Sequence, residues 1–162
     1  MIWPFRRKSK KRMARIVIDE PITSSTRVSV LKALKQIEDR EFPALIVRID
    51  SPGGTVGDSQ EIYSAIKRLK DKGCKVISSF GNISASGGVY IGVASDKIVA
   101  NPGTITGSIG VIIRGNNLSE LLDKIGIKFE TVKSGVFKDI LSPDKPLSEE
   151  GRGLLQGLID ES

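Results

Sequence analysis

The stretch ALIVRIDSPGG, residues 44–54, decides the fold of this chain. Its first seven residues, ALIVRID (44–50), are almost continuously apolar, as is typical of a parallel strand that other elements cover. A Pro-Gly-Gly turn follows the strand at once. Because ligands bind outside the carboxyl ends of the strands in open α/β sheets, a turn at this place is a candidate functional loop.

Short β-branched runs and amphipathic stretches alternate on both sides of this strand. Further strands are predicted at RIVID (15–19), KVISSF (75–80), KIVA (97–100), IGVII (109–113) and IKFETVK (127–133). Helices are predicted where apolar residues recur at helical spacing, namely at Val30, Leu31, Leu34 and Ile37, at Ile62, Ile66 and Leu69 ahead of Gly73, in NLSELLDKIG (117–126), and at Leu154, Leu155 and Leu158. Strands that are separated by helices need right-handed crossovers. We therefore expect an α/β fold with a mainly parallel sheet and helices packed outside it.

The composition excludes several classes of site. The 162 residues suit one domain, and 39% hydrophobic with 27% charged residues is typical of a globular α/β protein. The chain has no histidine and one cysteine, Cys74, which excludes Ser-His-Asp and Cys-His sites and a zinc site of Cys and His ligands. Any catalysis has to use Lys, Asp, Glu, Ser, Thr or Tyr, and no cofactor is expected. A lone cysteine forms no internal disulfide and suits a reducing compartment.

The net charge of +6 is concentrated at the amino terminus. Residues 1–15 contain seven of the 25 basic residues and no acidic one, which leaves 18 basic against 19 acidic residues in the rest of the chain. A nearly neutral body argues against a nucleic-acid partner. Residues 1–14 form a basic arm that also contains Trp3 and Phe5. Two interpretations of the arm stay open: a disordered solubilising segment, or contact with an anionic membrane surface.

The ends of the chain also lead to expectations. The arm has no apolar run of seven or more residues, so it is neither a secretory signal nor a transmembrane span. We expect the protein in the cytoplasm, peripheral at the membrane if the arm binds lipid. Residues 15–162 are expected to form a single domain. Because the last predicted helix stops without a clear cap, we expect the chain to be part of something longer.

Three glycine-rich turns follow predicted strands. In SPGG (51–54) the glycines leave backbone N–H groups unshielded, so this turn can hold an oxyanion, although the same residues also make ordinary tight turns. Ser86 stands between a strand and a helix, where its Oγ would be exposed beside the Gly87 amide. The alternative for Ser86 is a flexible connection or a helix cap. The third turn, residues 101–108, carries hydroxyl groups that can equally cap backbone groups.

A nucleophilic serine in this chain needs a base other than histidine, and lysine is the candidate. A lysine accepts a proton only when neutral, so burial has to lower its pKa from about 10.4 toward neutrality. Lys138 has the most apolar neighbours of the lysines, in VFKDIL (136–141). The negative charge of Asp139 would oppose this lowering of the lysine pKa. In an extended segment, however, successive side chains point to opposite sides, which would turn Asp139 away from Lys138. The alternative for Lys138 is a solvated surface lysine.

Four motifs, in this order, resemble the bacterial signal peptide peptidase A family of Ser-Lys serine peptidases: IDSPGG (49–54), SASGG (84–88), NPGTITGSIGV (101–111) and KSGVFKDILSP (133–143). The resemblance runs from about residue 15 to the end of the chain. It implies that Ser86 is the nucleophile and Lys138 the general base. It also implies that the backbone amides of Gly53 and Gly87 hold the oxyanion, and that Ser108 orients the lysine amine.

The same resemblance implies a Clp protease/crotonase-like fold, which is a repeated ββα spiral that usually assembles into rings or domes. In related peptidases the serine and the lysine of one site can come from neighbouring protomers, so we expect a homo-oligomer. Members of the family commonly carry an N-terminal membrane anchor, and here the basic arm occupies that position. They also normally continue beyond the end of this chain.

The expected function is a serine endopeptidase that cleaves peptides through a Ser-Lys dyad and an acyl-enzyme. The resemblance implies signal-peptide remnants or other apolar or membrane-associated polypeptides as substrates. Two alternatives stay open. One is an acyl-CoA enzyme of the crotonase class, against which the pairing of Ser86 with Lys138 argues. The other is a non-catalytic module that binds a membrane or nucleic acid through its basic arm.

Overall fold

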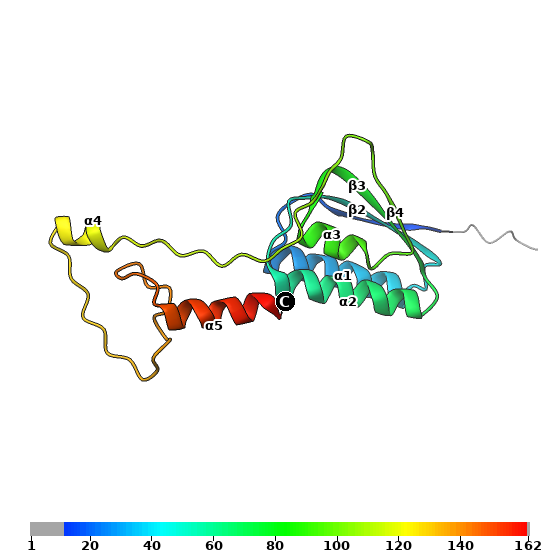
Figure 1. Ribbon diagram of the computed structural model, residues 1–162. Helices are drawn as coiled ribbons and strands as arrows, with labels where there is room; N and C mark the ends of the chain where they lie inside the picture. Colours follow the sequence, from blue (N-terminus) through cyan, green and yellow to red (C-terminus); the bar gives the residue numbers. More distant parts are fainter. Residues whose placement is uncertain (1–11, 162) are drawn as a thin grey trace, which may run out of the picture. The chain divides into compact units, whose positions relative to one another are not determined.

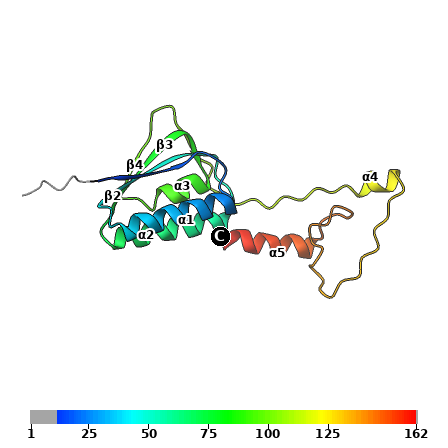
Figure 2. The same cartoon turned by 180° about the vertical axis from the view of Figure 1, so that it is seen from behind.

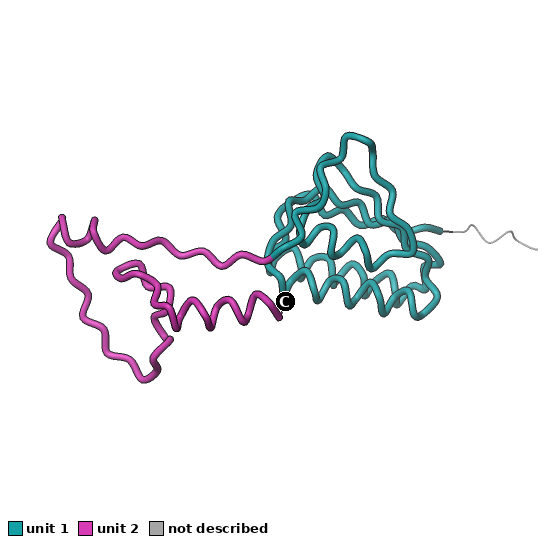
Figure 3. Tube along the Cα trace, viewed as in Figure 1, with its two compact units in different colours: residues 1–110 teal, residues 111–162 magenta. Residues whose placement is uncertain are grey.

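The computed structural model describes residues 12–161, which form two compact units within the ranges Met1–Gly110 and Val111–Ser162 (Figure 3). Each unit is described by itself. Residues 1–11 lie outside the described residues, so the disorder or membrane contact of the basic arm stays a prediction. The last residues of the arm contact the first unit: the Arg12 guanidinium lies 5.4 Å from the centre of the Phe42 ring, and the first strand begins at Ala14.

A five-stranded parallel sheet forms the centre of the first unit (Figure 1). Its strands are β1 (Ala14–Ile18), β2 (Ala44–Ser51), β3 (Lys75–Ala85), β4 (Lys97–Val99) and β5 (Ile105–Gly107). The strand order is β1-β2-β3-β4, and β4 and β5 pair with successive parts of β3. The predicted parallel sheet is confirmed. One strand is longer than predicted, because β3 continues from Phe80 to Ala85.

Three helices lie on one face of this sheet in both views (Figures 1 and 2). They are α1 (Ser24–Asp39), α2 (Val56–Asp71) and α3 (Gly87–Gly92). The helices bury most of the side chains that helical spacing predicted: Val30, Leu34 and Ile37 in α1, and Ile62, Ile66 and Leu69 in α2. These side chains belong to one core cluster with alternate residues of β1, β2 and β3. Burial of each large aliphatic side chain contributes roughly 1.5–3 kcal/mol, so this cluster holds the first unit together.

The prediction that other elements cover the strand at residues 44–50 is correct for only one of its two faces. Leu45, Val47 and Ile49 face the helices and are fully buried, whereas Ile46 and Arg48 on the other face are half-buried. The reason is that the helices of the first unit all lie on one face of the sheet. The continuous apolar run therefore alternates in burial.

The second unit contains two helices, α4 (Ser119–Lys124) and α5 (Glu149–Asp160). The strands predicted at residues 109–113 and 127–133 are wrong, because neither segment is a strand. A strand needs a neighbour for its ladder of backbone hydrogen bonds, and neither segment pairs with one in the described part of the chain. Their apolar side chains are open to solvent instead: Ile109, Ile112 and Val132 are 82%, 78% and 103% exposed.

Both helices predicted in this unit are confirmed. α4 is shorter than the predicted 117–126 and is followed by Gly126, which has a φ of 73°. α5 begins after Ser148, whose Oγ accepts a hydrogen bond from the Gly151 amide at 3.1 Å. No helix within residues 12–161 is long and apolar enough to cross a membrane.

Candidate active site

Two neighbouring strands of the first unit, β3 and β5, are each followed directly by a serine. Residues 83–85 of β3 pair in parallel with residues 105–107 of β5, so Ser86 and Ser108 follow at adjacent positions of the sheet's carboxyl edge. The Ser86 amide donates a hydrogen bond to the Gly107 carbonyl at 2.8 Å, which ties the two strand ends together. This is the edge at which open parallel sheets bind ligands.

Ser86 has a backbone conformation that serine rarely adopts. Its φ of 50° and ψ of −120° lie outside the main regions allowed for residues with a Cβ atom. Residues held in such conformations cluster at active sites, and a sharp strand-to-helix turn also exposes the nucleophilic serine of other hydrolases. The Ser86 side chain makes no capping hydrogen bond to α3. Ser86 is thus the N-cap residue of α3 by position, without a side-chain cap.

Gly53 packs directly against the Ser86 turn. Its φ of 95° lies in the region that favours glycine. A Cβ atom at this position would lie 2.8 Å from both the Ser86 Cβ and the Gly87 nitrogen, which is too close for any side chain. The SPGG turn and the Ser86 turn therefore meet through bare backbone, as the predicted oxyanion site requires.

The two predicted oxyanion donors have different partners. The Gly87 N–H has no acceptor among the described residues. The Gly53 N–H donates to Oγ of Ser51 at 3.2 Å. This bond is at the long end of the range for N–H···O, so a substrate oxygen can compete with Ser51 for the amide.

The segment between β1 and α1 anchors the SPGG turn, a role that the sequence analysis missed. The Ile22 amide donates to the Gly53 carbonyl at 2.9 Å, and the Thr55 amide donates to the Ile22 carbonyl at 3.0 Å. Oγ of Ser51 is fully buried and donates to the Glu20 carbonyl at 2.7 Å. The sequence contains one indication of this contact: a hydroxyl at the end of an apolar strand needs a partner once it is buried.

The predicted base, Lys138, belongs to the second unit, whereas the other four predicted site residues belong to the first. Within the first unit the structure brings Ser86, Gly53 and Gly87 into contact and places Ser108 beside them in register. Lys138 is exposed, and residues 136–141 form turns. The predicted extended segment, with Lys138 and Asp139 on opposite sides, is therefore wrong.

Asp139 is paired with two other lysines. Its carboxylate lies 2.6 Å from Nζ of Lys133 and also forms an ion pair with Lys145. Hydrogen bonds from Lys133 and then Lys145 lower the pKa of Asp139 to about 2. Among the described residues no ion pair joins Asp139 to Lys138. The acid beside the candidate base is thus already neutralised by other cations.

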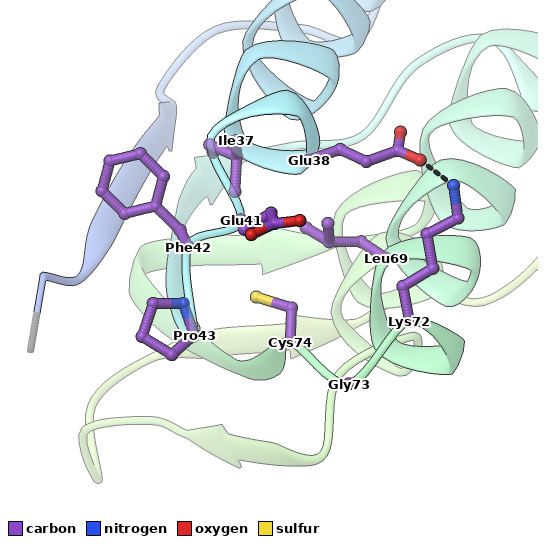
Figure 4. A pocket seen from close by; sticks show the side chains of 9 residues that line it. All are labelled: Ile37, Glu38, Glu41, Phe42, Pro43, Leu69, Lys72, Gly73 and Cys74. Atoms are coloured by element: carbon purple, nitrogen blue, oxygen red, sulfur yellow. Dashed lines mark hydrogen bonds and ion pairs between the residues drawn. The ribbon is translucent and has the colours of Figure 1, made fainter.

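A cavity of about 380 Å³ lies at the opposite edge of the sheet, where β2 and β3 begin (Figure 4). An ion pair between Glu38 and Lys72 crosses one side of it, and the sulfur of Cys74 points into it. Burial raises the pKa of the Cys74 thiol, which keeps the sulfur protonated and unreactive. This cavity is separate from the Ser86 turn and supplies no nucleophile.

Several known proteins similar to this chain are named as proteases. Residues 68–162 match Peptidase family S49. A protein named as a protease in Synechocystis sp. is 60% identical over 162 residues, which cover 100% of this chain and 58% of that protein. A protein named as signal peptide peptidase SppA in Enterococcus faecium is 42% identical over 130 residues, 80% of this chain and 38% of the relative. The chain thus spans only part of the length of these relatives.

Two solved structures of a membrane-bound stomatin-specific protease, 1510-N, are also similar. One is a serine-to-alanine variant, and the other is a lysine-to-alanine variant in complex with a substrate peptide. The latter matches with a TM-score of 0.54 at 29% identity, and covers 65% of this chain and 47% of that chain. The predicted family resemblance and the Clp protease/crotonase-like α/β fold are confirmed.

Proposed function

Because the chain belongs to peptidase family S49, we propose that it is a serine endopeptidase with Ser86 as the nucleophile. The observation that carries this proposal is the Ser86 backbone, with φ 50° and ψ −120°, in contact with Gly53. A backbone in such a region costs about 1–3 kcal/mol and persists only where the surrounding structure enforces it. An ordinary connection between a strand and a helix would not need this strain.

The proposed reaction is acyl transfer to Ser86. Its Oγ attacks the carbonyl carbon of a peptide bond, and the Gly87 amide donates to the oxygen that becomes negative. The Gly53 amide donates a second hydrogen bond to the same oxygen. To do so, it gives up its bond to Oγ of Ser51, which is 3.2 Å long in the resting structure. Collapse of the tetrahedral intermediate expels the amine and leaves an acyl-enzyme, which water hydrolyses.

Lys138 is the proposed general base, oriented by a hydrogen bond from Ser108. The neutral amine takes the proton from Oγ of Ser86, returns it to the leaving nitrogen and then activates the water. The resemblance of residues 133–143 supports this assignment, as does the family match, which includes both the serine and the lysine. A neutral lysine needs burial, and Lys138 is exposed in its own unit. We therefore place its burial in a homo-oligomer.

The proposed substrates are apolar peptides, including signal-peptide remnants and membrane-associated polypeptides. The resemblance to the signal peptide peptidase A family supports this choice, as does the similarity to the Enterococcus relative. In this proposal the enzyme acts from the cytoplasm, and the cationic residues 1–14 bring it to anionic lipid. The acyl-CoA alternative is less well supported, because the relatives reported above are named as proteases.

The test is cleavage of a fluorogenic apolar peptide, measured against pH. We expect activity to rise through a neutral-to-alkaline pKa and to fall by about 10⁴-fold or more in Ser86→Ala and in Lys138→Ala. Two control variants, Ser84→Ala and Lys128→Ala, remove the same side-chain types nearby and should keep their activity. A fluorophosphonate should label the unchanged chain and not Ser86→Ala. Full cleavage by purified Ser86→Ala would contradict the proposal.

A further inference from the structure

The strand that leads to Ser86 contains a two-residue bulge. Ile49 of β2 pairs with Phe80 of β3, but Ser51, two residues later, pairs with Ser84, four residues later. One residue of β2, Asp50, therefore stands opposite three residues of β3. Bulges of this kind interrupt the ladder and redirect the strand, and they are frequent next to active sites.

Asp50 satisfies the backbone of the bulge. Its Oδ1 accepts a hydrogen bond from the Ile83 amide at 3.0 Å, and Nδ2 of Asn82 lies 3.5 Å from its Oδ2. A Cβ atom at Gly81 would overlap the carboxylate, so the glycine leaves the space that Asp50 fills. Backbone hydrogen bonds from Ile83 and then Asn82 lower the pKa of Asp50, so the acceptor is ionised at neutral pH.

The remaining sides of the bulge are also fixed. Oγ1 of Thr104, in the loop before β5, donates to the Gly81 carbonyl at 2.8 Å. Arg48 donates hydrogen bonds to the Phe80 carbonyl at 2.8 Å and to Oγ of Ser79 at 3.0 Å. Its positive charge also attracts the Asp50 carboxylate. The bulge is therefore clamped between β2 and the β5 loop, and Asp50 supplies the only carboxylate that the described residues place on it.

This bulge decides which residue of β3 reaches the SPGG turn. If the Ile49–Phe80 register continued without it, Ser84 would come opposite Gly53 in place of Ser86. We propose that Asp50 is a positioning residue for the peptidase site: by accepting the bulge amides, it holds Ser86 level with the amides of Gly53 and Gly87. This inference rests on the proposed role of Ser86 as the nucleophile.

The chain contains a matched control for Asp50. Ile18 of β1 pairs with Ile49 of β2, so Asp19 follows its strand at the position that corresponds to Asp50. Asp19 is exposed and accepts no hydrogen bond among the described residues. Asp50→Ala and Asp19→Ala therefore remove the same group from adjacent strand ends. Asp50→Asn is the conservative variant, because its amide oxygen can still accept the Ile83 bond.

The test measures amide hydrogen exchange together with labelling of Ser86 by a fluorophosphonate. In Asp50→Ala we expect the Ile83 and Ser86 amides to exchange about tenfold faster or more, and labelling to slow by about 10–100-fold. For peptide cleavage, kcat should fall by a similar factor with little change in KM. Asp50→Asn should restore most of the exchange protection, the labelling rate and kcat, and Asp19→Ala should match the unchanged chain. If Asp50→Ala does not fold, Asp50→Ser replaces it, since the serine hydroxyl is too short to reach Ile83.

Three results would overturn the inference. One is an Ile83 amide that exchanges at the same rate with and without the Asp50 carboxylate. The second is faster exchange at Ile83 alone, with Ser86 exchange and labelling unchanged, which would limit Asp50 to a local contact. If the unchanged chain neither reacts with the fluorophosphonate nor cleaves the peptide, the proposed function fails. Comparison of Ser86 amide exchange in the unchanged chain and in Asp50→Ala then still tests whether Asp50 positions this turn. Unchanged Ser86 exchange would be the third overturning result.

Discussion

The two units of the chain are stabilised in different ways. In the first unit, aliphatic side chains of α1, α2 and the sheet form one buried cluster. In the second unit, Gly151 is the only buried residue among those described, and ion pairs around Asp139 connect neighbouring turns. The turn that carries Ser86 is therefore built on a packed core, whereas Lys138 lies on a segment without one. Substitutions near Ser86 should thus have sharper effects than substitutions near Lys138.

Among the substitutions that test this difference between the units, the largest effect is expected from Gly53→Ala. The added methyl group would meet the Ser86 Cβ and the Gly87 nitrogen at 2.8 Å, and a φ of 95° is strained for alanine. Displacing this amide removes one oxyanion donor, so kcat should fall by about 10²–10³-fold. The φ strain alone costs roughly 1–2 kcal/mol of stability. Peptide cleavage and thermal unfolding of the purified variant measure the two effects.

Gly57→Ala is the control for this substitution. Gly57 lies in the first turn of α2, where a Cβ atom would meet nothing within 4 Å. Alanine is the better helix former, so the variant should be as stable or more stable, by up to about 1 kcal/mol, and fully active. Equal losses in the two variants would show that close backbone contact at Gly53 does not matter.

A smaller effect should separate two buried serines of the same unit. Ser51 and Ser84 pair across β2 and β3, and both are fully buried. Oγ of Ser51 bonds to the Glu20 carbonyl and the Gly53 amide, whereas Oγ of Ser84 has no partner among the described residues. Ser51→Ala should cost about 1–3 kcal/mol, because the buried Gly53 amide and the Glu20 carbonyl both lose their partner. Ser84→Ala should be neutral or slightly stabilising.

Urea unfolding of the two variants measures this difference. Because the two residues are neighbours with the same burial, the loss of packing is similar in both and largely cancels in the comparison. A Ser84→Ala variant as destabilised as Ser51→Ala would mean that burial of the hydroxyl, and not its hydrogen bonds, determines the stability of this edge.

The difference between the units also explains which features could be predicted from the sequence. In the first unit, a continuous apolar run predicted β2 correctly and helical spacing predicted α1 and α2, because the core that buries Leu45 or Ile66 lies within the same unit. In the second, the apolar run at 127–133 predicted a strand that has no partner there. β propensity cannot supply that partner, since a strand depends on a neighbour elsewhere in space.

The candidate site shows the same division. Ser86 and the glycines could be proposed from local motifs, because a glycine-rich turn after a strand is visible within a few residues, although the contact of Gly53 with the Ser86 turn is not. The roles of Ser51 and Asp50 could not, although both lie inside IDSPGG. Their partners, Glu20 and Ile83, are about thirty residues away in the sequence, and the register shift that brings Asp50 to Ile83 leaves no periodic pattern.

The smallest effect is expected in the second unit, from Asp139→Asn. The carboxylate has a pKa of about 2, below the ordinary value of 3.8, because Lys133 and Lys145 pair with it. A lowered pKa means that the stabilisation is complete above pH 3.8 and is lost as the pH falls through about 2. The pairs are partly exposed, so the gain is modest and decreases with salt.

The measurement is hydrogen exchange of the amides of residues 136–142. In the unchanged chain, their protection should fall as the pH is lowered from 3.8 to about 2. The control Asp123→Asn should show the same fall, because Asp123 is exposed and unpaired among the described residues. Asp139→Asn should show lower protection at neutral pH and no such step. A step of equal size in Asp139→Asn would assign it to another acid, and the ion pairs would then not be what holds these turns.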